Sequence, residues 1–345
     1  MPPLAPMLAR AVHELPRGDQ LWYEPKWDGF RALVFRDGSE VEITSRNEQP
    51  LTRYFPEVCD AARAELPERC VLDGELVIFG PTGLDFGALL QRIHPAASRV
   101  TRLARETPAS YVAFDLLAHG GADLRHVPFG ERRRALELVA GHSRTFICTP
   151  GTTEPALAEE WFTRFEGGGL DGVIAKRLDL AYRENERAMA KWKHERSADC
   201  VIGGIRRQKD GAVASLLLGL YDARGVLNHV GVAAAFTAAR RRELAALLDP
   251  LEVHENHPWL DTAPGRGRRP GGESRWSAKR DLSFVAVRPD IVCEVAYDHL
   301  HGDRFRHATT FRRLRPDRDP SSCTYDQLEA VAPAELAELA ERAVH

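Results

Sequence analysis

The stretch WYEPKWDGFRALVF, residues 22–35, holds one of the six lysines in a chain of 345 residues. The other 41 of the 47 basic side chains are arginines, so lysine stands at position 26 in a chain that rarely uses it. A guanidinium stays charged at any working pH, whereas an amine can lose its proton and become a nucleophile. The scarcity of lysine therefore indicates covalent catalysis at Lys26, with a plain surface lysine as the alternative.

Lysines further along the chain fit the same chemistry. Lys176 ends DGVIAK (171–176), and Lys191 and Lys193 lie in AKWKHE (190–195). Two lysines that are two residues apart on an extended segment project to the same side. That side would suit a phosphate chain.

Around the opening stretch, the sequence up to residue 195 or so alternates short strand-like runs with loops. The runs are apolar or alternating and are bounded by Gly, Asp or Pro. Two segments, 56–66 and 129–141, have helical spacing. Because no regular βαβ alternation appears, the pattern predicts an α+β fold with mainly antiparallel sheets. The strand-like runs are FRALVF (30–35), VEITS (41–45), VLDGELVIF (71–79), YVAFDLLA (111–118) and GVIAK (172–176).

The texture changes after SADC (197–200), where five strand-like segments follow with one clear helix, 237–249, among them. Five strands and one helix in about 120 residues suit a small Greek-key barrel of the oligonucleotide-binding (OB) type. We therefore predict a first domain at 1–197 and an OB-fold β-barrel domain at 198–345, which ends in a C-terminal amphipathic helix. The segments are VIGGIRR (201–207), VASLLLGLYD (213–222), GVLNHVGVAAAF (225–236), LSFVAVR (282–288) and IVCEVAYD (291–298).

Charge and cysteine usage limit the class of protein. The formal net charge is −3, so a nucleic acid would have to meet local arginine clusters, which occur at 240–242, 266–269 and 304–318. A solvated arginine-rich surface is the alternative for each cluster. The six cysteines are scattered without a C-x-x-C pair, which favours a reducing cytoplasm over a zinc knuckle or a disulfide framework. We expect no membrane association, because the sequence has no apolar run of about 18 residues and no secretory signal.

These residues together carry a family resemblance. EPKWDGFR (24–31) resembles the K-x-D-G-x-R motif of the covalent nucleotidyltransferases, which are the DNA ligases, RNA ligases and mRNA-capping enzymes. In size and texture the chain is most similar to the short bacterial ATP-dependent DNA ligases of the ligase C type. Six further segments resemble the family's other motifs in the family's order: SRNEQPLTRYFPE (45–57), LDGELVIF (72–79), YVAFDLL (111–117), LDGVIAK (170–176), AKWKHE (190–195) and FRRLRPDR (311–318).

The resemblance implies a role for the lysine and its neighbours. Lys26 would attack the α-phosphorus of ATP, expel pyrophosphate and become a lysyl-AMP phosphoramidate. Glu24 would contact the adenine amino group, with a surface acid as the alternative. Three further lysines would depress the pKa of Lys26 and neutralise the phosphoryl charge, namely Lys176, Lys191 and Lys193.

Other positions take their roles from the matching motifs. Arg31 and Arg46 would contact the nucleotide or the 5′-phosphate of a nick. Phe114 would stack on adenine, although an aromatic residue in an apolar strand usually belongs to the core. Glu75 would contact the ribose or bind Mg²⁺. Asp171 would bind Mg²⁺ at a position where many family members have the longer glutamate.

The last motif contains a second departure from the family. Asp317 and Arg318 would orient the pyrophosphate, but many members have lysine at the position of Arg318. A hinge near Ser197 would let the barrel swing over ATP and then over DNA.

The resemblance as a whole implies an ATP-dependent DNA ligase that seals 5′-phosphate and 3′-hydroxyl ends in nicked or gapped duplex DNA, with Mg²⁺ or Mn²⁺ as its metal. ATP is preferred over NAD, because only 25 residues precede Lys26 and these are too few for a nicotinamide-reading domain. We expect a bacterial, cytoplasmic, nucleoid-associated monomer that acts in DNA repair, with repair or end-joining proteins as candidate partners. Two alternatives stay open: an RNA-directed nucleotidyltransferase (an RNA ligase or a GTP-using capping enzyme) and a non-catalytic nucleic-acid-binding protein.

Overall fold

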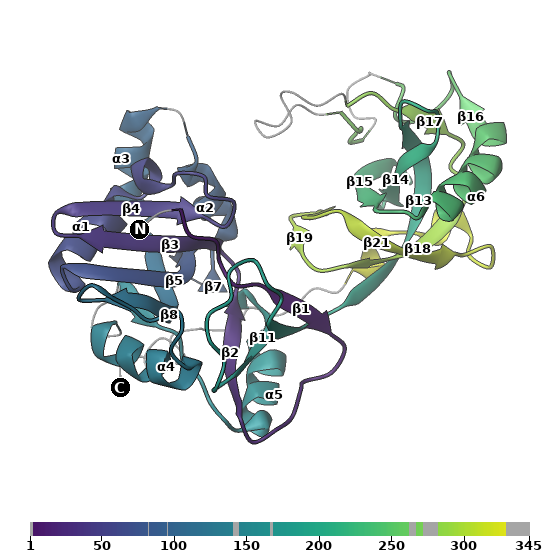
Figure 1. Cartoon of the computed structure of the whole chain (residues 1–345). Coiled ribbons are helices and arrows are strands. Elements are labelled where there is room, and N and C mark those ends of the chain that lie inside the picture. The colour runs from purple at the N-terminus through teal and green to yellow at the C-terminus, as the bar shows by residue number, and fades with distance from the viewer. Residues whose placement is uncertain are drawn as a thin grey trace. The chain divides into compact units, whose positions relative to one another are not determined.

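The chain forms two compact units in this computed structural model, one up to His194 and one from Glu195 (Figure 1). Each unit has a buried apolar core of its own. The structure describes residues 3–81, 83–94, 96–140, 145–165, 168–261, 267–271 and 282–328.

The first unit contains two main sheets, of which the larger has six strands. These are β3 (Phe30–Asp37), β4 (Glu40–Ser45), β5 (Arg69–Val77), β8 (Ser110–His119), β9 (Ala122–Asp123) and β10 (Phe146–Cys148). Their order is β10-β8-β5-β3-β4, with β9 paired to β8. Only the pairing of β10 with β8 is parallel among these strands, so the predicted mainly antiparallel sheet is confirmed.

The smaller sheet has four strands in the order β1-β12-β11-β2. They are β1 (Ala9–Val12), β2 (Leu21–Trp27), β11 (Leu170–Arg177) and β12 (Met189–Lys193). β1 runs parallel to β12, and the other two pairings are antiparallel. The first and last parts of the unit therefore meet in one sheet.

Residues 22–35 carry the chain from the smaller sheet to the larger one, because β2 leads into β3 through Asp28 and Gly29 (Figure 1). A Cβ atom at position 29 would lie 2.1 Å from the carbonyl oxygen of Leu76, so only glycine fits this passage. Lys26, one residue before the end of β2, therefore lies where the two sheets meet.

The larger sheet buries both of its faces. Along β3, Ala32 and Val34 belong to a core shared with the helices, whereas Leu33 and Phe35 pack on the opposite side with Met7. This alternation follows from the two-residue period of a strand. A strand covered on both faces reads as a continuous apolar run, as FRALVF does.

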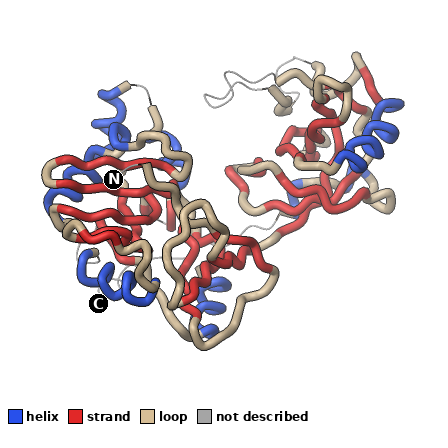
Figure 2. The backbone as a smooth tube through the Cα atoms, in the orientation of Figure 1, coloured by secondary structure: helices blue, strands red, loops and turns tan. Residues whose placement is uncertain are grey.

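The part of this unit that the structure describes also contains five α-helices (Figure 2). α1 and α4 confirm the two helices predicted from spacing, whereas α2, α3 and α5 were not predicted. The helices are α1 (Pro56–Glu65), α2 (Phe86–Arg92), α3 (Ala97–Glu106), α4 (Phe129–Val139) and α5 (Pro155–Arg164).

The second unit is built on β13 (Arg196–Arg207), β14 (Val213–Tyr221), β15 (Leu227–Ala234), β18 (Val292–Tyr297) and β21 (Thr309–Leu314). β13 pairs with β14, β14 with β15, β15 with β21, β21 with β18, and β18 with β13. This ring of pairings closes a small barrel, as predicted. The single helix of this unit that exceeds one turn in the described residues is α6 (Ala238–Leu248).

One barrel strand differs from the prediction. The segment predicted as a barrel strand at 282–288 contains only the short β17 (Val285–Val287), which pairs with β13 and with β16 (Glu252–Val253) outside the ring. Its place in the ring belongs to β21, whose sequence TTFRRL is largely polar and half exposed. A polar strand gives no apolar run, so the sequence signal was absent.

The division between the units lies between His194 and Glu195, and Ser197, near which the hinge was placed, lies inside β13. The predicted C-terminal helix falls outside the described residues. Within the part of the chain that the structure describes, no helix is long and apolar enough to cross a membrane.

Candidate active site

A pocket of about 190 Å³ opens where the two sheets of the first unit meet. Strands of both sheets line it, with contributions from β2, β3, β5, β8, β11 and β12. Asp171 and Lys193 lie next to the pocket, because Asp171 forms ion pairs with Lys26, which lines the pocket, and with Lys193. Eight predicted site residues line the pocket directly: Glu24, Lys26, Arg31, Arg46, Glu75, Phe114, Lys176 and Lys191.

The Lys26 amine forms an ion pair with Asp171 through the Oδ2 atom. The same oxygen lies 3.2 Å from the Lys193 Nζ atom, so one carboxylate joins two lysines. The side chain of Asp171 is buried and that of Lys26 keeps some exposure to the pocket. Asp171 therefore holds the end of the Lys26 side chain in a defined place.

The protein's own charges raise the pKa of Lys26 above its ordinary value. Burial is the largest single influence and would lower this pKa, but the carboxylates of Asp171, Glu75 and Asp28 together outweigh it. Neighbouring lysines were expected to depress this pKa, but the carboxylates outweigh their effect in this structure. Lys191 is the lysine whose pKa is lowered, by burial and by the charges of Lys193 and Lys26.

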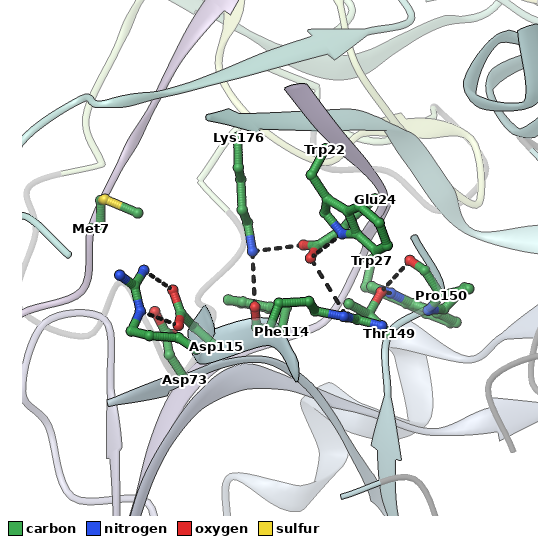
Figure 3. A network of polar contacts seen from close by, with 12 residues as sticks. Met7, Trp22, Glu24, Trp27, Asp73, Phe114, Asp115, Thr149, Pro150 and Lys176 are labelled. Atoms are coloured by element: carbon green, nitrogen blue, oxygen red, sulfur yellow. Dashed lines mark hydrogen bonds and ion pairs between the residues drawn. The ribbon is translucent and has the colours of Figure 1, made fainter. Parts of the chain in front are cut away.

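Glu24 lies at another part of the pocket and is buried, so it is not the surface acid considered as the alternative. Its Oε2 atom lies 2.7 Å from Nζ of Lys176, which also donates to the carbonyl oxygen of Phe114 at 2.9 Å (Figure 3). The indole of Trp22 donates to Oε1 of Glu24 at 3.2 Å. Burial raises the pKa of Glu24, and the charges of Lys176 and Arg133 partly offset that rise.

This network assigns Lys176 a different place from the one expected. Its side chain is almost fully buried and paired with Glu24, rather than directed at Lys26. Its ammonium lies 5.0 Å from the centroid of the Phe114 ring and 4.6 Å from that of Phe129. Lys176 therefore fixes the carboxylate of Glu24 and the ring of Phe114 relative to each other.

Arg31 also lies beside the Phe114 ring and is held by Asp73, a carboxylate that was not predicted as a site residue. Its Nε and Nη2 atoms donate to the two oxygens of Asp73 at 2.8 and 2.7 Å. Tyr182 donates to Asp73 at 2.7 Å, and the Arg31 guanidinium lies 4.7 Å from the centroid of the Phe114 ring. Asp73 lies two residues before Glu75 in a largely apolar strand. A charged residue in such a strand needs a buried partner, and this was the signal in the sequence that could have identified Asp73.

Glu75 accepts a hydrogen bond from the backbone N–H of Gly29 at 3.2 Å. Burial raises the pKa of Glu75 to about 7, although the charges of Lys26 and Arg31 oppose the rise. A nearby cation would lower the pKa of such a buried carboxyl group, because positive charge favours its ionised form. Glu75 is therefore suited to bind a metal ion.

Magnesium fits these residues as an ion shared with a nucleotide. Within the described residues no group of three or more His, Cys, Asp or Glu side chains is placed to hold a metal. Mg²⁺ is usually bound by one or two carboxylates together with substrate phosphates and water. Glu75 and Asp171, which both act on the charge of Lys26, match that kind of site.

Asp115, next to Phe114, has a structural partner. Both of its oxygens accept hydrogen bonds from Arg132 of α4, each at 2.8 Å, and both side chains are buried. Arg132 also donates to the carbonyl oxygens of Val127 and Leu180. Asp115 therefore connects β8 to α4 and keeps Phe114 in position.

Replacing Asp115 with alanine should destabilise the protein by about 3–5 kcal/mol, because it leaves the buried Arg132 without its carboxylate. Urea denaturation followed by circular dichroism measures this change. The matched control is Asp37→Ala in the same sheet, where the partner Arg69 is exposed and the loss should stay below about 1 kcal/mol. Equal losses in the two variants would contradict the structural role of Asp115.

The last motif lies in the second unit. Arg315 donates to Asp317 at 2.9 and 2.8 Å, and these hydrogen bonds lower the pKa of Asp317 to about 2. Arg318 lies 3.2 Å from an oxygen of Asp199, which Arg315 also contacts. Asp317 and Arg318 therefore have partners within the second unit, whereas Lys26 belongs to the first.

The chain matches two family models. The description "ATP dependent DNA ligase domain" covers residues 3–193, and "ATP dependent DNA ligase C terminal region" covers residues 209–318. The two matches fall on the two compact units.

Among curated proteins, DNA ligase C2 of Mycolicibacterium smegmatis is 54% identical over 339 residues, which cover 96% of this chain and 95% of that protein. The multifunctional non-homologous end joining DNA repair protein LigD of Mycobacterium tuberculosis is 30% identical over 92% of this chain and 39% of its own length. Among solved structures, a Lig E DNA ligase aligns with a TM-score of 0.56 at 17% identity over 90% of this chain and 100% of that chain, which shows a likeness of fold.

Proposed function

The chain belongs to the ATP-dependent DNA ligase family, and from this premise we propose how its own residues carry out the reaction. The enzyme is an ATP-dependent DNA ligase that joins 5′-phosphate and 3′-hydroxyl ends through a lysyl-AMP intermediate. The observation that carries the residue assignment is the arrangement in one pocket of a lysine amine and a buried glutamate from one motif with an aromatic ring from another. The similarity to DNA ligase C2 extends over nearly the whole of both chains, which favours DNA over the RNA-directed and non-catalytic alternatives.

In the first step, Nζ of Lys26 forms a bond to the α-phosphorus of ATP, and the bond from that phosphorus to the bridging oxygen breaks as pyrophosphate leaves. The amine must first lose a proton, and the Asp171 carboxylate in contact with Nζ is placed to hold that proton. Lys191 and Lys193 would offset the charge of the reacting phosphates. When bound by Glu75 and Asp171, Mg²⁺ would supply further positive charge beside the phosphates, which favours the neutral amine.

The base and sugar would lie away from the phosphates. Phe114 would stack on adenine. Its ring lines the pocket and is held by contacts with the cationic groups of Arg31 and Lys176. Glu24 would accept a hydrogen bond from the adenine 6-amino group. Glu75 would contact the ribose when it does not bind metal.

In the later steps, AMP passes to the 5′-phosphate of the DNA, and the adjacent 3′-hydroxyl then attacks that phosphate with AMP as the leaving group. Arg31 and Arg46 would contact the 5′-phosphate, for which arginine offers paired N–H donors. Asp317 and Arg318 would orient the pyrophosphate in the first step. To do so they would exchange their present contacts with Arg315 and Asp199 for contacts with the nucleotide.

The DNA substrate would be nicked or gapped duplex, bound through arginine clusters such as 240–242 and 304–318. The similarity to LigD, which is named for non-homologous end joining, supports a role in repair with end-joining proteins as partners. The relatives are bacterial, and we infer a nucleoid-associated monomer.

The reaction can be followed with α-labelled nucleotide and a nicked duplex. Label should reach the protein from ATP and not from GTP, and a nicked DNA duplex should remove the label as the strand is sealed. A nicked RNA duplex should be sealed far more slowly. Labelling from GTP alone, or sealing of RNA in preference to DNA, would favour the capping or RNA-ligase alternative.

Removing divalent metal should stop labelling of the protein. With excess EDTA we expect the rate of lysyl-AMP formation to fall by at least roughly 10³-fold, because the phosphoryl charge is then met only by basic side chains. Added Mg²⁺ should restore the rate, and Mn²⁺ should substitute. Full labelling in EDTA would show that Glu75 and Asp171 serve no metal.

A further inference from the structure

Helix α4 places a second cation beside Glu24. Arg133 of this helix is buried, and its Nη1 atom lies 3.7 Å from Oε1 of Glu24. It belongs to none of the motifs that carry the family resemblance, and it does not line the pocket itself. Any effect on a bound base would therefore act through Glu24.

The contacts of Arg133 leave part of its guanidinium directed at that carboxylate. Its Nε atom donates to Glu137 at 2.9 Å, on the more exposed side of the helix. The buried Nη1 atom has no hydrogen-bond partner among the described residues. At 3.7 Å the approach to Glu24 is too long for a hydrogen bond, but it is close enough for direct electrostatic attraction.

Trp22 joins Arg133 and Glu24 into one assembly. The Arg133 guanidinium lies 5.2 Å from the centroid of the Trp22 indole, and the indole N–H donates to the same oxygen of Glu24 that Arg133 approaches. A Cβ atom at Gly151 would lie 2.3 Å from Trp22, so the loop packs tightly against the ring. The backbone of Thr152 pairs with Tyr23 at the edge of β2, which fixes that loop.

The two oxygens of Glu24 are thus held by different groups. Oε2 contacts Lys176, which also contacts Phe114, whereas Oε1 contacts Trp22 (Figure 3). Arg133 approaches the same Oε1 atom. Removing Arg133 and Trp22 would leave Lys176 as the only one of these three partners, and the carboxylate could then rotate toward it. A rotated carboxylate would no longer present the same lone pairs to a bound purine.

We propose that Arg133 and Trp22 are positioning residues that hold the Glu24 carboxylate in the orientation that selects a purine with a 6-amino group. The inference rests on the proposed contact of Glu24 with adenine. A carboxylate fixed in this way accepts a hydrogen bond from the 6-amino group and gains nothing from a purine that lacks it. Selectivity for adenine therefore depends on a helix outside the nucleotide-binding motifs.

The test compares ATP with purine riboside triphosphate, which lacks only the 6-amino group. Lysyl-nucleotide formation is measured by intact mass at subsaturating nucleotide for wild type and Arg133→Gln. For Arg133→Gln the rate with ATP should fall by about tenfold, the size of one weakened hydrogen bond to a charged group. The rate with purine riboside triphosphate should change less than about twofold, because that nucleotide makes no such bond.

Three further variants define the cause. Trp22→Phe keeps an aromatic ring without the indole donor and should reduce the preference for ATP in the same direction. Arg133→Lys keeps the charge and should retain most of the preference. Arg134→Gln, on the exposed face of the same helix, is the matched control and should behave as wild type.

Equal losses with both nucleotides, or no loss with either, would overturn the proposal, since a merely structural effect cannot distinguish a single amino group. If Arg133→Gln does not fold, Trp22→Phe decides by the same ratio. Failure of the proposed function would give a different result from failure of this inference, because the wild-type protein would then form no lysyl-nucleotide with ATP.

Discussion

Lys26→Arg should abolish formation of lysyl-AMP, with a loss of at least roughly 10⁴-fold, as expected when a nucleophile is removed. The substitution keeps the positive charge beside Asp171, so it separates charge from nucleophilicity. A guanidinium remains protonated under all working conditions and cannot form the phosphoramidate. The measurement is transfer of α-labelled AMP to the protein in the presence of Mg²⁺.

The loss should be confined to the steps that need lysyl-AMP. Lys26→Arg should still seal a nick that already carries AMP on its 5′-phosphate, because the 3′-hydroxyl is the nucleophile in that step. Lys209→Arg, at an exposed position of the second unit, is the matched control and should label normally. Normal labelling of Lys26→Arg would show that another residue accepts AMP.

Asp171→Asn has the second largest expected effect, a fall of roughly 10²–10³-fold in both labelling and sealing. It removes the charge that contacts Lys26 and Lys193 together, and one of the two carboxylates proposed for Mg²⁺. The variant should also need more Mg²⁺ for half-maximal labelling. Asp179→Asn, which alters an exposed ion pair just beyond the same strand, should change neither value.

The shorter acid at position 171 allows a finer comparison. Asp171→Glu restores the residue that many family members have but extends the side chain by about 1.5 Å. Since Asp171 already contacts Lys26 directly, the longer acid must bend away from its present place, and we expect intermediate activity. Activity at or above the wild-type level would show that the metal, and not the contact with Lys26, determines the requirement for a carboxylate here.

Residues from the motifs that carry the family resemblance line one pocket of the first unit. The apolar or alternating runs predicted β3, β4, β5, β8 and β11, and Gly29 marked the tight turn after Lys26. The strands β2 and β12, which are partly polar, were not among the predicted runs. The polar strand β21 was missed, because its alternation exposes half of its side chains and leaves no apolar run.

The charge state of Lys26 could not be predicted in the same way. Its pKa depends on which charge is nearest, and the sequence does not state whether Asp171 or Lys176 takes that place. In the structure Asp171 contacts the amine of Lys26, and Lys176 forms an ion pair with Glu24 instead. The supporting residues Asp73 and Arg133 were missed for the same reason, since a buried charge is identified by its partner rather than by a motif.

The central claim is that Lys26 carries AMP between ATP and DNA. Its most direct test is peptide mapping by mass spectrometry of wild-type protein after reaction with ATP and Mg²⁺, before and after addition of nicked duplex DNA. The account predicts AMP on the peptide that contains Lys26, and its disappearance as the nick is sealed. AMP on Lys176, Lys191 or Lys193 instead, or AMP on Lys26 that survives sealing of the nick, would contradict it.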